Sequence, residues 1–459
     1  EEQTTPFLAR MAREGLVLEN NSAASPWTLP SHISLFTALH PRAHGVRGGA
    51  RMLPRDPEPT ETLTRRFRDA GYLTYGVYSA PFLHPAYGFH DGFVEYHAAE
   101  KYLEEGSNID AITDPALRRM MEVHGLADAT YGNAPRVNEM AEEFLEGAAR
   151  GDRPFFLFLH YWDVHYNYLP PEDYARRFLP DFGPEDKQLG IDFTPAHGDE
   201  EQREYSAREL ARIQALYDAE IRYVDDHLAR IYAKIDELGI ADDVILAVVS
   251  DHGDHFGESH EGKVELFHHR TLYQEVMHVP ALVLAPGRLE AGTRVAASTS
   301  LYDVGPTLLD LAGLPVWPGR SGQSVVPLIG QSGALGHEVH MDLRHPGVPA
   351  DLQGFRQGSL KVIRDHGWPA GGGQPGLPAS TRFFDLAQDP HEQAPKSLEA
   401  VGSAGAVALS AMKALGPAKP APLMEELPDN VAAGLQNTGY VDSFDSDAGT
   451  SQSGSGGGD

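Results

Sequence analysis

The feature that most constrains this chain is a run of six apolar residues, Val244–Val249, followed at once by the polar segment 250–260. A run that is apolar at every position predicts a strand buried on both faces, as in a parallel sheet. A second such run, Pro154–Leu159, leads into His160. In open α/β sheets, ligands gather beyond the carboxyl ends of such strands. The two runs therefore predict an α/β fold with a polar site at one edge of its sheet.

Helices and strands alternate along most of the chain. Apolar spacing and glycine stop signals predict helices at 4–14, 30–39, 61–70, 204–238 and 303–312, and strands at 73–78, 154–159, 244–249 and 280–284. Gly71, Gly239 and Gly313 each follow a predicted helix, the position where a left-handed residue ends it. This alternation predicts a wound sheet flanked by helices.

The pattern of apolar and polar residues changes near residue 335. Short alternating stretches at 360–364 and 383–386 predict a small antiparallel sheet. We therefore expect a catalytic α/β domain over 1–334, an α+β subdomain over 335–442 and a disordered Ser/Gly/Asp-rich tail over 443–459. Two insertions rich in acids, glycine and proline, 97–135 and 170–203, are expected to shape the substrate pocket.

Composition excludes several classes of function. The chain has 459 residues, a net charge of −29 and no basic block, which argues against nucleic-acid binding. It has no cysteine, so disulfides, zinc–thiolate sites and a cysteine nucleophile are excluded. No apolar run approaches the roughly 20 residues of a membrane span. The chain starts at Glu1 without a methionine, which leaves a cytoplasmic and a periplasmic or secreted location both open.

The first polar cluster precedes the predicted helix 30–39. It contains Thr28, Ser31 and His32 around Pro30. A hydroxyl at a helix N-terminus lies in positive potential beside unpaired N–H groups, which suits a tetrahedral anion such as phosphate or sulfate. The alternative is plain N-capping by Thr28 or Ser31.

Two further clusters follow the all-apolar runs. Asp163 and His165 lie after the first run, and Asp251 and His252 come directly after the second. The second pair suits metal binding, and its alternative is a solvated polar loop. Downstream, the adjacent residues His268 and His269 would face opposite ways in an extended segment, so we expect only one of them to face the site.

The order of these segments resembles the sulfatase family of the alkaline phosphatase superfamily, from about residue 4 to residue 441. The segments that carry the resemblance are 4–15, 26–32, 39–46, 163–165, 250–253, 302–315 and 384–390. The resemblance implies an alkaline-phosphatase-like wound mixed sheet flanked by helices, with a small C-terminal antiparallel sheet subdomain. It also implies a metal-dependent hydrolase of ester bonds, similar to arylsulfatases and phosphodiesterases.

The resemblance also implies roles for single residues. Thr28 stands where sulfatases have the Cys or Ser that becomes formylglycine, and His32 where most members have an arginine. Asp251 and His252 fall on metal ligands, and His165 on a residue that contacts the transferred group. In the downstream pair, His268 or His269 falls near the residue that serves the leaving group.

Threonine cannot become the formylglycine aldehyde, so the resemblance implies a different nucleophile chemistry. We expect the Thr28 hydroxyl to form a covalent sulfo- or phospho-threonine intermediate. One divalent cation would be held by Asp251, His252 and the Thr28 oxygen. Mn²⁺, Mg²⁺ or Ca²⁺ suits these ligands, with Zn²⁺ as a further candidate. The family's remaining carboxylate ligands would lie upstream of Glu1, on a first strand that we expect to be missing here.

The expected substrate is a sulfate, phosphate or phosphonate ester of a small molecule, glycan or lipid. Two alternatives share these residues. One is a transferase that moves a phospho-alcohol headgroup to an acceptor, which an acceptor-dependence assay would identify. The other is a non-catalytic relative that keeps the fold for binding, which would hold no divalent ion.

Overall fold

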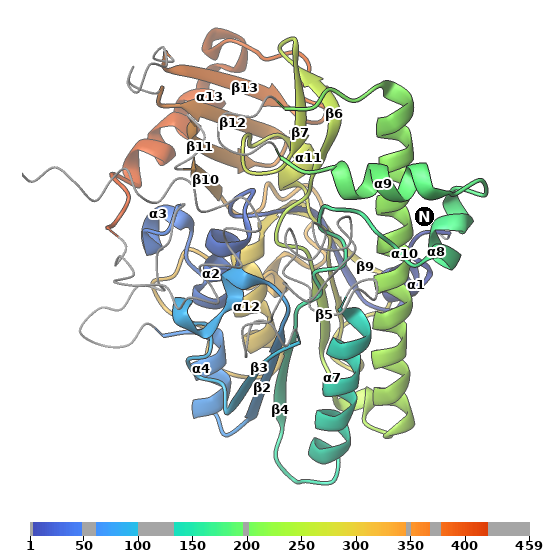
Figure 1. The fold of residues 1–459 in the computed structure, drawn as a ribbon. Helices are drawn as coiled ribbons and strands as arrows, with labels where there is room; N and C mark the ends of the chain where they lie inside the picture. Colours follow the sequence, from blue (N-terminus) through green and yellow to red (C-terminus); the bar gives the residue numbers. More distant parts are fainter. Residues whose placement is uncertain are drawn as a thin grey trace, which may run out of the picture.

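A computed structural model describes residues 3–47, 61–99, 133–195, 202–345, 350–367 and 378–420 (Figure 1). The α-helices are α1 (Pro6–Glu14), α2 (Thr28–Thr37), α3 (Pro41–His44), α4 (Leu63–Asp69), α7 (Ala134–Ala148), α8 (Glu172–Phe178), α9 (Pro184–Asp192), α10 (Ala207–Glu237), α11 (Gln274–Met277), α12 (Leu301–Leu311) and α13 (Leu398–Ala414). The strands are β1 (Leu16–Ser22), β2 (Leu73–Tyr78), β3 (Glu95–Ala98), β4 (Phe155–Leu159), β5 (Leu246–Val249), β6 (His255–His260), β7 (Lys263–Phe267), β8 (Ala281–Leu284), β9 (Thr293–Ser300), β10 (Val339–His345), β11 (Ala350–Gln357), β12 (Leu360–Asp365) and β13 (Ser380–Asp385).

The main domain is built on mixed sheets flanked by helices, which confirms the predicted fold class. Strand β2 pairs in parallel with β3 and β4. Strand β1 pairs in parallel with β9 and antiparallel with β8, and β8 pairs antiparallel with β5. Along β4, Phe156 and Phe158 pack towards α2 and α4, whereas Phe155 and Leu157 pack towards α7 and α10. Alternate side chains of one strand thus join helix layers on its two faces.

The two all-apolar runs form β4 and β5, and β4 has the expected parallel partner, but the expectation that both strands are fully buried is wrong. Every residue of β4 and of β5 is only half-buried, and β5 is antiparallel to β8. Within the described ranges, each strand lies at the end of its sheet's order, in β3-β2-β4 and in β5-β8-β1-β9. A strand with a neighbour on one side only leaves part of its surface open.

The C-terminal region contains the expected antiparallel sheet. Strands β10 to β13 follow one another in order, and α13 packs on them through Ala408 and Met412. The domain boundaries at 334 and 442 stay a prediction. The tail 443–459 and most of the insertion 97–135 lie outside the described residues, whereas the insertion 170–203 supplies α8 and α9, which pack on α10.

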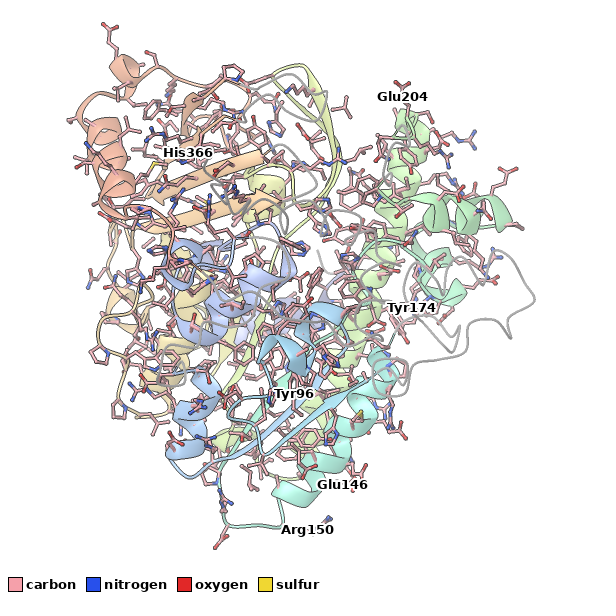
Figure 2. All side chains as sticks on the ribbon, turned by 60° about the vertical axis from the view of Figure 1, so that its left-hand side comes forward. Tyr96, Glu146, Arg150, Tyr174, Glu204 and His366 are labelled. Carbon is pink, nitrogen blue, oxygen red and sulfur yellow. The ribbon has the colours of Figure 1, made fainter. Side chains whose placement is uncertain are left out.

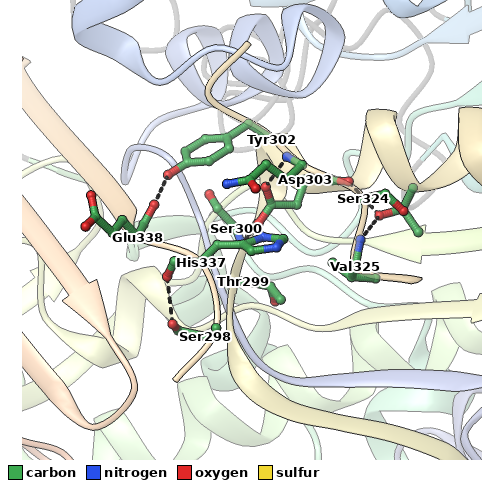
Figure 3. A network of polar contacts seen from close by, with 12 residues as sticks. Ser298, Thr299, Ser300, Tyr302, Asp303, Ser324, Val325, His337 and Glu338 are labelled. Carbon is green, nitrogen blue, oxygen red and sulfur yellow. Dashed lines mark hydrogen bonds and ion pairs between the residues drawn. The ribbon is translucent and has the colours of Figure 1, made fainter. Parts of the chain in front are cut away.

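A polar network joins the C-terminal sheet to the main domain (Figure 3). Asp303, in the first turn of α12, accepts a hydrogen bond from the Ser300 amide at 2.8 Å and contacts His337 Nδ1 at 3.0 Å. The Tyr302 hydroxyl donates to the carbonyl of Glu338 at 3.3 Å and accepts from the His340 amide at 2.8 Å. These bonds fix the segment that enters β10 against the start of α12.

Side chains fill the space between the helices and sheets (Figure 2). His366 lies in the region of the C-terminal sheet, and Glu146 and Arg150, around the end of α7, lie at the opposite end of the molecule. In the described part of the chain, no helix combines the length and the apolar composition that crossing a membrane requires.

Candidate active site

The ends of β4 and β5 and the start of α2 meet at one pocket. Its lining residues come from four segments of the chain: Thr28, His160, Tyr161, Trp162, Val164, His165, Tyr217, Ser250, Asp251, His252, Gly253 and Asp254. The structure therefore brings together one residue or more from each of the three clusters predicted from the sequence. They meet beyond the ends of β4 and β5, which belong to two different sheets.

Thr28 is the first residue of α2 and is almost fully buried, with 2 % of its surface exposed. The helix begins two residues before the predicted start, and its N-cap is Trp27, with no side-chain capping bond. The alternative of capping by Thr28 or Ser31 is therefore wrong. Ser31 instead donates to the carbonyl of Ser25 at 2.6 Å. The Thr28 hydroxyl is thus left to face the pocket from the positive end of a helix.

Three atoms converge at the base of the pocket. The Nε2 atom of His252 lies 3.3 Å from Thr28 Oγ1 and 3.6 Å from Asp251 Oδ2. The Nδ1 atom of His252 donates to the carbonyl of Gly253 at 3.0 Å, which leaves the Nε2 lone pair pointing at the other two atoms. Ligands about 2.1 Å from one tetrahedral ion lie about 3.4 Å apart, and both distances from His252 Nε2 are close to this value.

The charges at this base also suit a cation. Burial raises the pKa of Asp251, but the neighbouring histidines His252, His32, His160 and His268 together lower it by more, so the pKa lies well below its usual range. For His32, burial lowers the pKa and the nearby Asp251 raises it, with a net lowering.

His32 lies behind the pocket and is not among its lining residues. Its Nδ1 atom donates to the carbonyl of Thr28 at 2.9 Å and lies 3.5 Å from Asp251 Oδ2. Its ring also packs edge-on against the ring of His160, with 5.2 Å between centroids. His32 therefore contacts both Thr28 and Asp251 and is placed to hold them in position.

His165 forms one wall of the pocket. Its ring stacks on Trp162, with 4.0 Å between centroids, and its Nδ1 atom donates to the carbonyl of Tyr166 at 2.5 Å. Its Nε2 atom is buried and has no hydrogen-bond partner among the described residues. Burial lowers the pKa of His165 well below its usual value, so the ring is neutral. A neutral ring of this kind can offer Nε2 to a bound group.

His268 lies behind the pocket wall, fully buried, and packs on the ring of His252 at 4.2 Å between centroids. Its Nδ1 atom contacts Asp254 Oδ1 at 2.7 Å, and the other oxygen of Asp254 accepts from the Tyr168 hydroxyl at 2.6 Å. An imidazole whose Nδ1–H is held by a carboxylate has its Nε2 atom directed for proton transfer.

The expectation that His268 and His269 alternate along an extended segment does not apply, because the segment is not extended. Phe267 and His269 both have a positive φ, of 62° and 61°. The backbone amide of His269 donates to the carbonyl of Pro26 at 3.0 Å. That bond ties the segment after β7 to the segment before α2, and the ring of His269 packs edge-on against His268.

Sequence reasoning missed three contributors to the site. His160 lines the pocket directly after β4, and burial lowers its pKa to about 3. Asp254 and Tyr217 line it as well. The position of His160 directly after an all-apolar run could have indicated that it belongs to the site. Nothing in the sequence around Tyr217 on α10 indicated this. Asp163 has a structural part, because its Oδ1 atom accepts from the Ala134 amide at the start of α7.

Comparisons with known proteins identify relatives of this chain. The sequence profile of the family described as sulfatase matches residues 1–314. Among curated relatives, human arylsulfatase K is 27 % identical over 215 residues, which cover 47 % of this chain and 39 % of that protein. Chicken arylsulfatase K is 30 % identical over 193 residues, which cover 41 % of this chain and 34 % of the relative. The chain thus spans well under half the length of these relatives.

Solved structures share the fold over most of the chain. The phosphonate monoester hydrolase of Agrobacterium radiobacter superposes with a TM-score of 0.65 and 22 % identity, covering 90 % of each chain. A protein solved in complex with its substrate D-glucosamine-2-N,6-O-disulfate superposes with a TM-score of 0.64 and 18 % identity, covering 89 % of this chain and 92 % of that one.

Proposed function

Because the chain belongs to the sulfatase family, we propose that it hydrolyses a sulfate, phosphate or phosphonate ester through a covalent intermediate on Thr28. The observation that carries the proposal is the position of the Thr28 hydroxyl. It lies at the N-terminus of α2, in the pocket, 3.3 Å from His252 Nε2. A nucleophile there faces the transferred group in a region of positive potential.

A divalent cation fits the convergence of Thr28 Oγ1, Asp251 Oδ2 and His252 Nε2 described above. Bound there, it would lower the pKa of the Thr28 hydroxyl and stabilise negative charge on the transferred group. Two protein oxygens and one imidazole nitrogen suit Mn²⁺, Mg²⁺ or Ca²⁺, with Zn²⁺ as a further candidate. The remaining coordination positions would be filled by substrate oxygens, by water or by carboxylates from outside the described residues.

Each residue of the site then has a separate role in the reaction. The Thr28 hydroxyl loses its proton to pocket solvent, and its oxygen bonds to the sulfur or phosphorus as the bond to the leaving oxygen breaks. His165 holds a non-bridging oxygen through Nε2, and His32 positions Thr28 through the backbone carbonyl. His268, held by Asp254, supplies a proton to the leaving oxygen, and His269 supports this segment. Water then cleaves the bond between sulfur or phosphorus and the Thr28 oxygen and releases the transferred group as sulfate, phosphate, a phosphate monoester or a phosphonate, according to the substrate.

The known proteins that resemble this chain frame the substrate. Arylsulfatase K and a phosphonate monoester hydrolase are named for sulfate and phosphonate esters, and a third neighbour binds a sulfated glucosamine. All three substrates present a tetrahedral oxyanion on an organic group. We propose the same class here, as an ester of a small molecule or a glycan.

Variants of Thr28 test the proposal. Aryl sulfates, phosphate diesters and phosphonate esters are assayed with the full chain and with each of the four divalent ions named above. We expect Thr28→Ala to lower kcat by about a thousandfold or more on the preferred substrate, and Thr28→Ser to retain measurable turnover. Thr37→Val, on the same helix but outside the pocket lining, is the control. Turnover by Thr28→Ala equal to that of the unchanged protein would refute the assignment.

A further inference from the structure

A second group of metal-ligating side chains lies outside the pocket. His255 and His260 are at the two ends of β6, and Glu275 is on α11. One ligand atom from each of the three lies within 4.8 Å of the others. We call this group the hairpin cluster, because β6 and β7 form a two-stranded hairpin between α9 and the C-terminal sheet (Figure 1).

The hairpin cluster is enclosed by protein. His255 and His260 are 1 % and 2 % exposed. The ring of His260 stacks on Tyr273, with 3.7 Å between centroids and 9° between planes, and the hydroxyl of Tyr273 accepts from Arg382 on β13. Ligand atoms in such surroundings have little access to bulk water.

Polar atoms in the hairpin cluster have no hydrogen-bond partner among the described residues. These atoms are His255 Nδ1, both ring nitrogens of His260 and Glu275 Oε2. His260 Nε2 lies 3.3 Å from Glu275 Oε2, in contact but without hydrogen-bond geometry. Buried polar groups in native proteins are rarely left in this state, and a bound ion is one recognised explanation.

The orientation of His255 supports the same explanation. Its Nε2 atom lies 2.8 Å from the Thr271 hydroxyl oxygen. In the tautomer that donates this bond from Nε2, the lone pair is on Nδ1, the atom that would bind the ion, and Nδ1 lies 3.4 Å from Glu258 Oε2. A hydrogen bond from the distal nitrogen is also how proteins orient a ligating histidine.

We propose that His255, His260 and Glu275 bind a divalent transition-metal ion, Zn²⁺ in the first instance. Two imidazoles and one carboxylate are ligands that Zn²⁺ accepts in proteins, and a water molecule would complete four-coordination. The distance of 3.3 Å between His260 Nε2 and Glu275 Oε2 already matches the separation of two ligands on one such ion.

The ion would have a structural role. It would join both ends of β6 to α11, the helix whose Val276 carbonyl accepts a hydrogen bond at 3.0 Å from the Gly253 amide in the pocket loop. A notional Cβ on Gly253 would come within 2.2 Å of the Glu275 carbonyl oxygen, so the pocket loop lies directly on α11. The hairpin cluster thereby supports the loop that carries Asp251, His252 and Asp254. This inference does not depend on the proposed catalytic activity.

The experiment separates this site from the pocket. The full chain is prepared as Asp251→Asn/His252→Gln, which removes two ligands of the pocket site, and is stripped of metal. Zn²⁺ binding is measured calorimetrically, and Co²⁺ binding by its visible absorption bands. We expect one ion per chain, with Co²⁺ bands of a four-coordinate site. In this background, His260→Gln and Glu275→Gln should weaken binding by more than about 100-fold, and Thr271→Val by about 10- to 100-fold.

His90→Gln, an exposed histidine elsewhere in the described chain, serves as the matched control and should bind as the background does. Circular dichroism verifies the fold of each variant. If His260→Gln or Glu275→Gln does not fold, Thr271→Val decides the test, since it removes only one hydroxyl. The proposal is overturned if the background variant binds neither ion at micromolar concentration, or if Thr271→Val and the folded ligand variants bind as tightly as the background.

Discussion

Two groups of polar side chains both take residues from the stretch 250–275, and they have different surroundings. The first is the pocket cluster, formed by Thr28, His165, Asp251, His252, Asp254 and His268. Most of its members line a cavity. The hairpin cluster is closed over by Tyr273 and α11. Similar side chains therefore line a pocket in one place and are enclosed by protein in the other.

After Thr28→Ala, the largest effect should come from Asp254, which lines the pocket and contacts His268. Asp254→Asn removes the carboxylate that holds His268 Nδ1 at 2.7 Å. General acid–base catalysis contributes about 10²- to 10⁴-fold, so we expect kcat to fall by about 100- to 1000-fold. Steady-state kinetics would show the loss in kcat with a smaller change in KM.

Zn²⁺ binding by this variant gives the matching readout. We expect Asp254→Asn to bind Zn²⁺ at the hairpin cluster as the unchanged chain does. If the variant lost Zn²⁺ there, the two clusters would be one coupled unit, and the contrast between them would fail.

The next effect concerns stability and belongs to the hairpin cluster. In the Asp251→Asn/His252→Gln background, Zn²⁺ at 100 times its Kd should stabilise the chain by about 2.7 kcal/mol, since only the folded state holds the three ligands together. Thermal unfolding with and without Zn²⁺ would show a rise in Tm of a few degrees. Adding Glu275→Gln should abolish the rise, and an equal rise with that variant would contradict the assignment.

A smaller effect concerns His44, a buried histidine that belongs to neither cluster. Both of its ring nitrogens are used: Nδ1 accepts from the Val46 amide at 3.1 Å and Nε2 contacts Ser34 Oγ at 3.0 Å. Burial lowers its pKa to about 3. The folded pKa lies below the unfolded value of about 6.5. The contribution of the neutral His44 ring to the free energy of unfolding is therefore fully present above pH 6.5 and is lost as the pH falls towards 3.

The variant His44→Gln tests this sign. When the pH falls from 7 to 5, the unfolded chain gains a proton on His44 and the folded chain does not. The free energy of unfolding should fall by about 2 kcal/mol for this reason. His44→Gln should therefore lose about 2 kcal/mol less over that interval, whatever its stability at pH 7. Denaturant unfolding at the two pH values measures the difference, with His90→Gln as the control. An unchanged pH dependence would show that His44 is not held neutral.

The local signals in the sequence identified much of the fold. Helix periodicity and glycine stops predicted α1, α4, α10 and α12, and the all-apolar runs predicted β4 and β5. The burial predicted from these runs was wrong, because an all-apolar sequence does not distinguish a strand at the edge of a sheet from one in its centre. Pairing direction was equally hidden, since β5 runs antiparallel to β8 through contacts that are distant in sequence.

Most site residues that lie at the end of a strand or the start of a helix were predicted from the sequence. Site residues that reach the pocket only through tertiary packing were missed. Thr28, Asp251, His252 and His165 all line the pocket. His32 does not, because its ring turns back to the carbonyl of Thr28 one helical turn away. Tyr217 reaches the pocket from the middle of a long amphipathic helix. The hairpin cluster could not be predicted, since the turn between β6 and β7 and the position of α11 decide it.

The central claim is that the Thr28 hydroxyl is the nucleophile. The most direct measurement is mass spectrometry of the peptide containing Thr28, after acid quenching of the metal-loaded full chain during turnover of its preferred ester. We expect Thr28 to gain the mass of one sulfuryl, phosphoryl or phosphonyl group early in turnover and to lose it as substrate is exhausted. Product formation with the group on another residue, or with Thr28 unmodified at every time sampled and Thr28→Ala fully active, would contradict it.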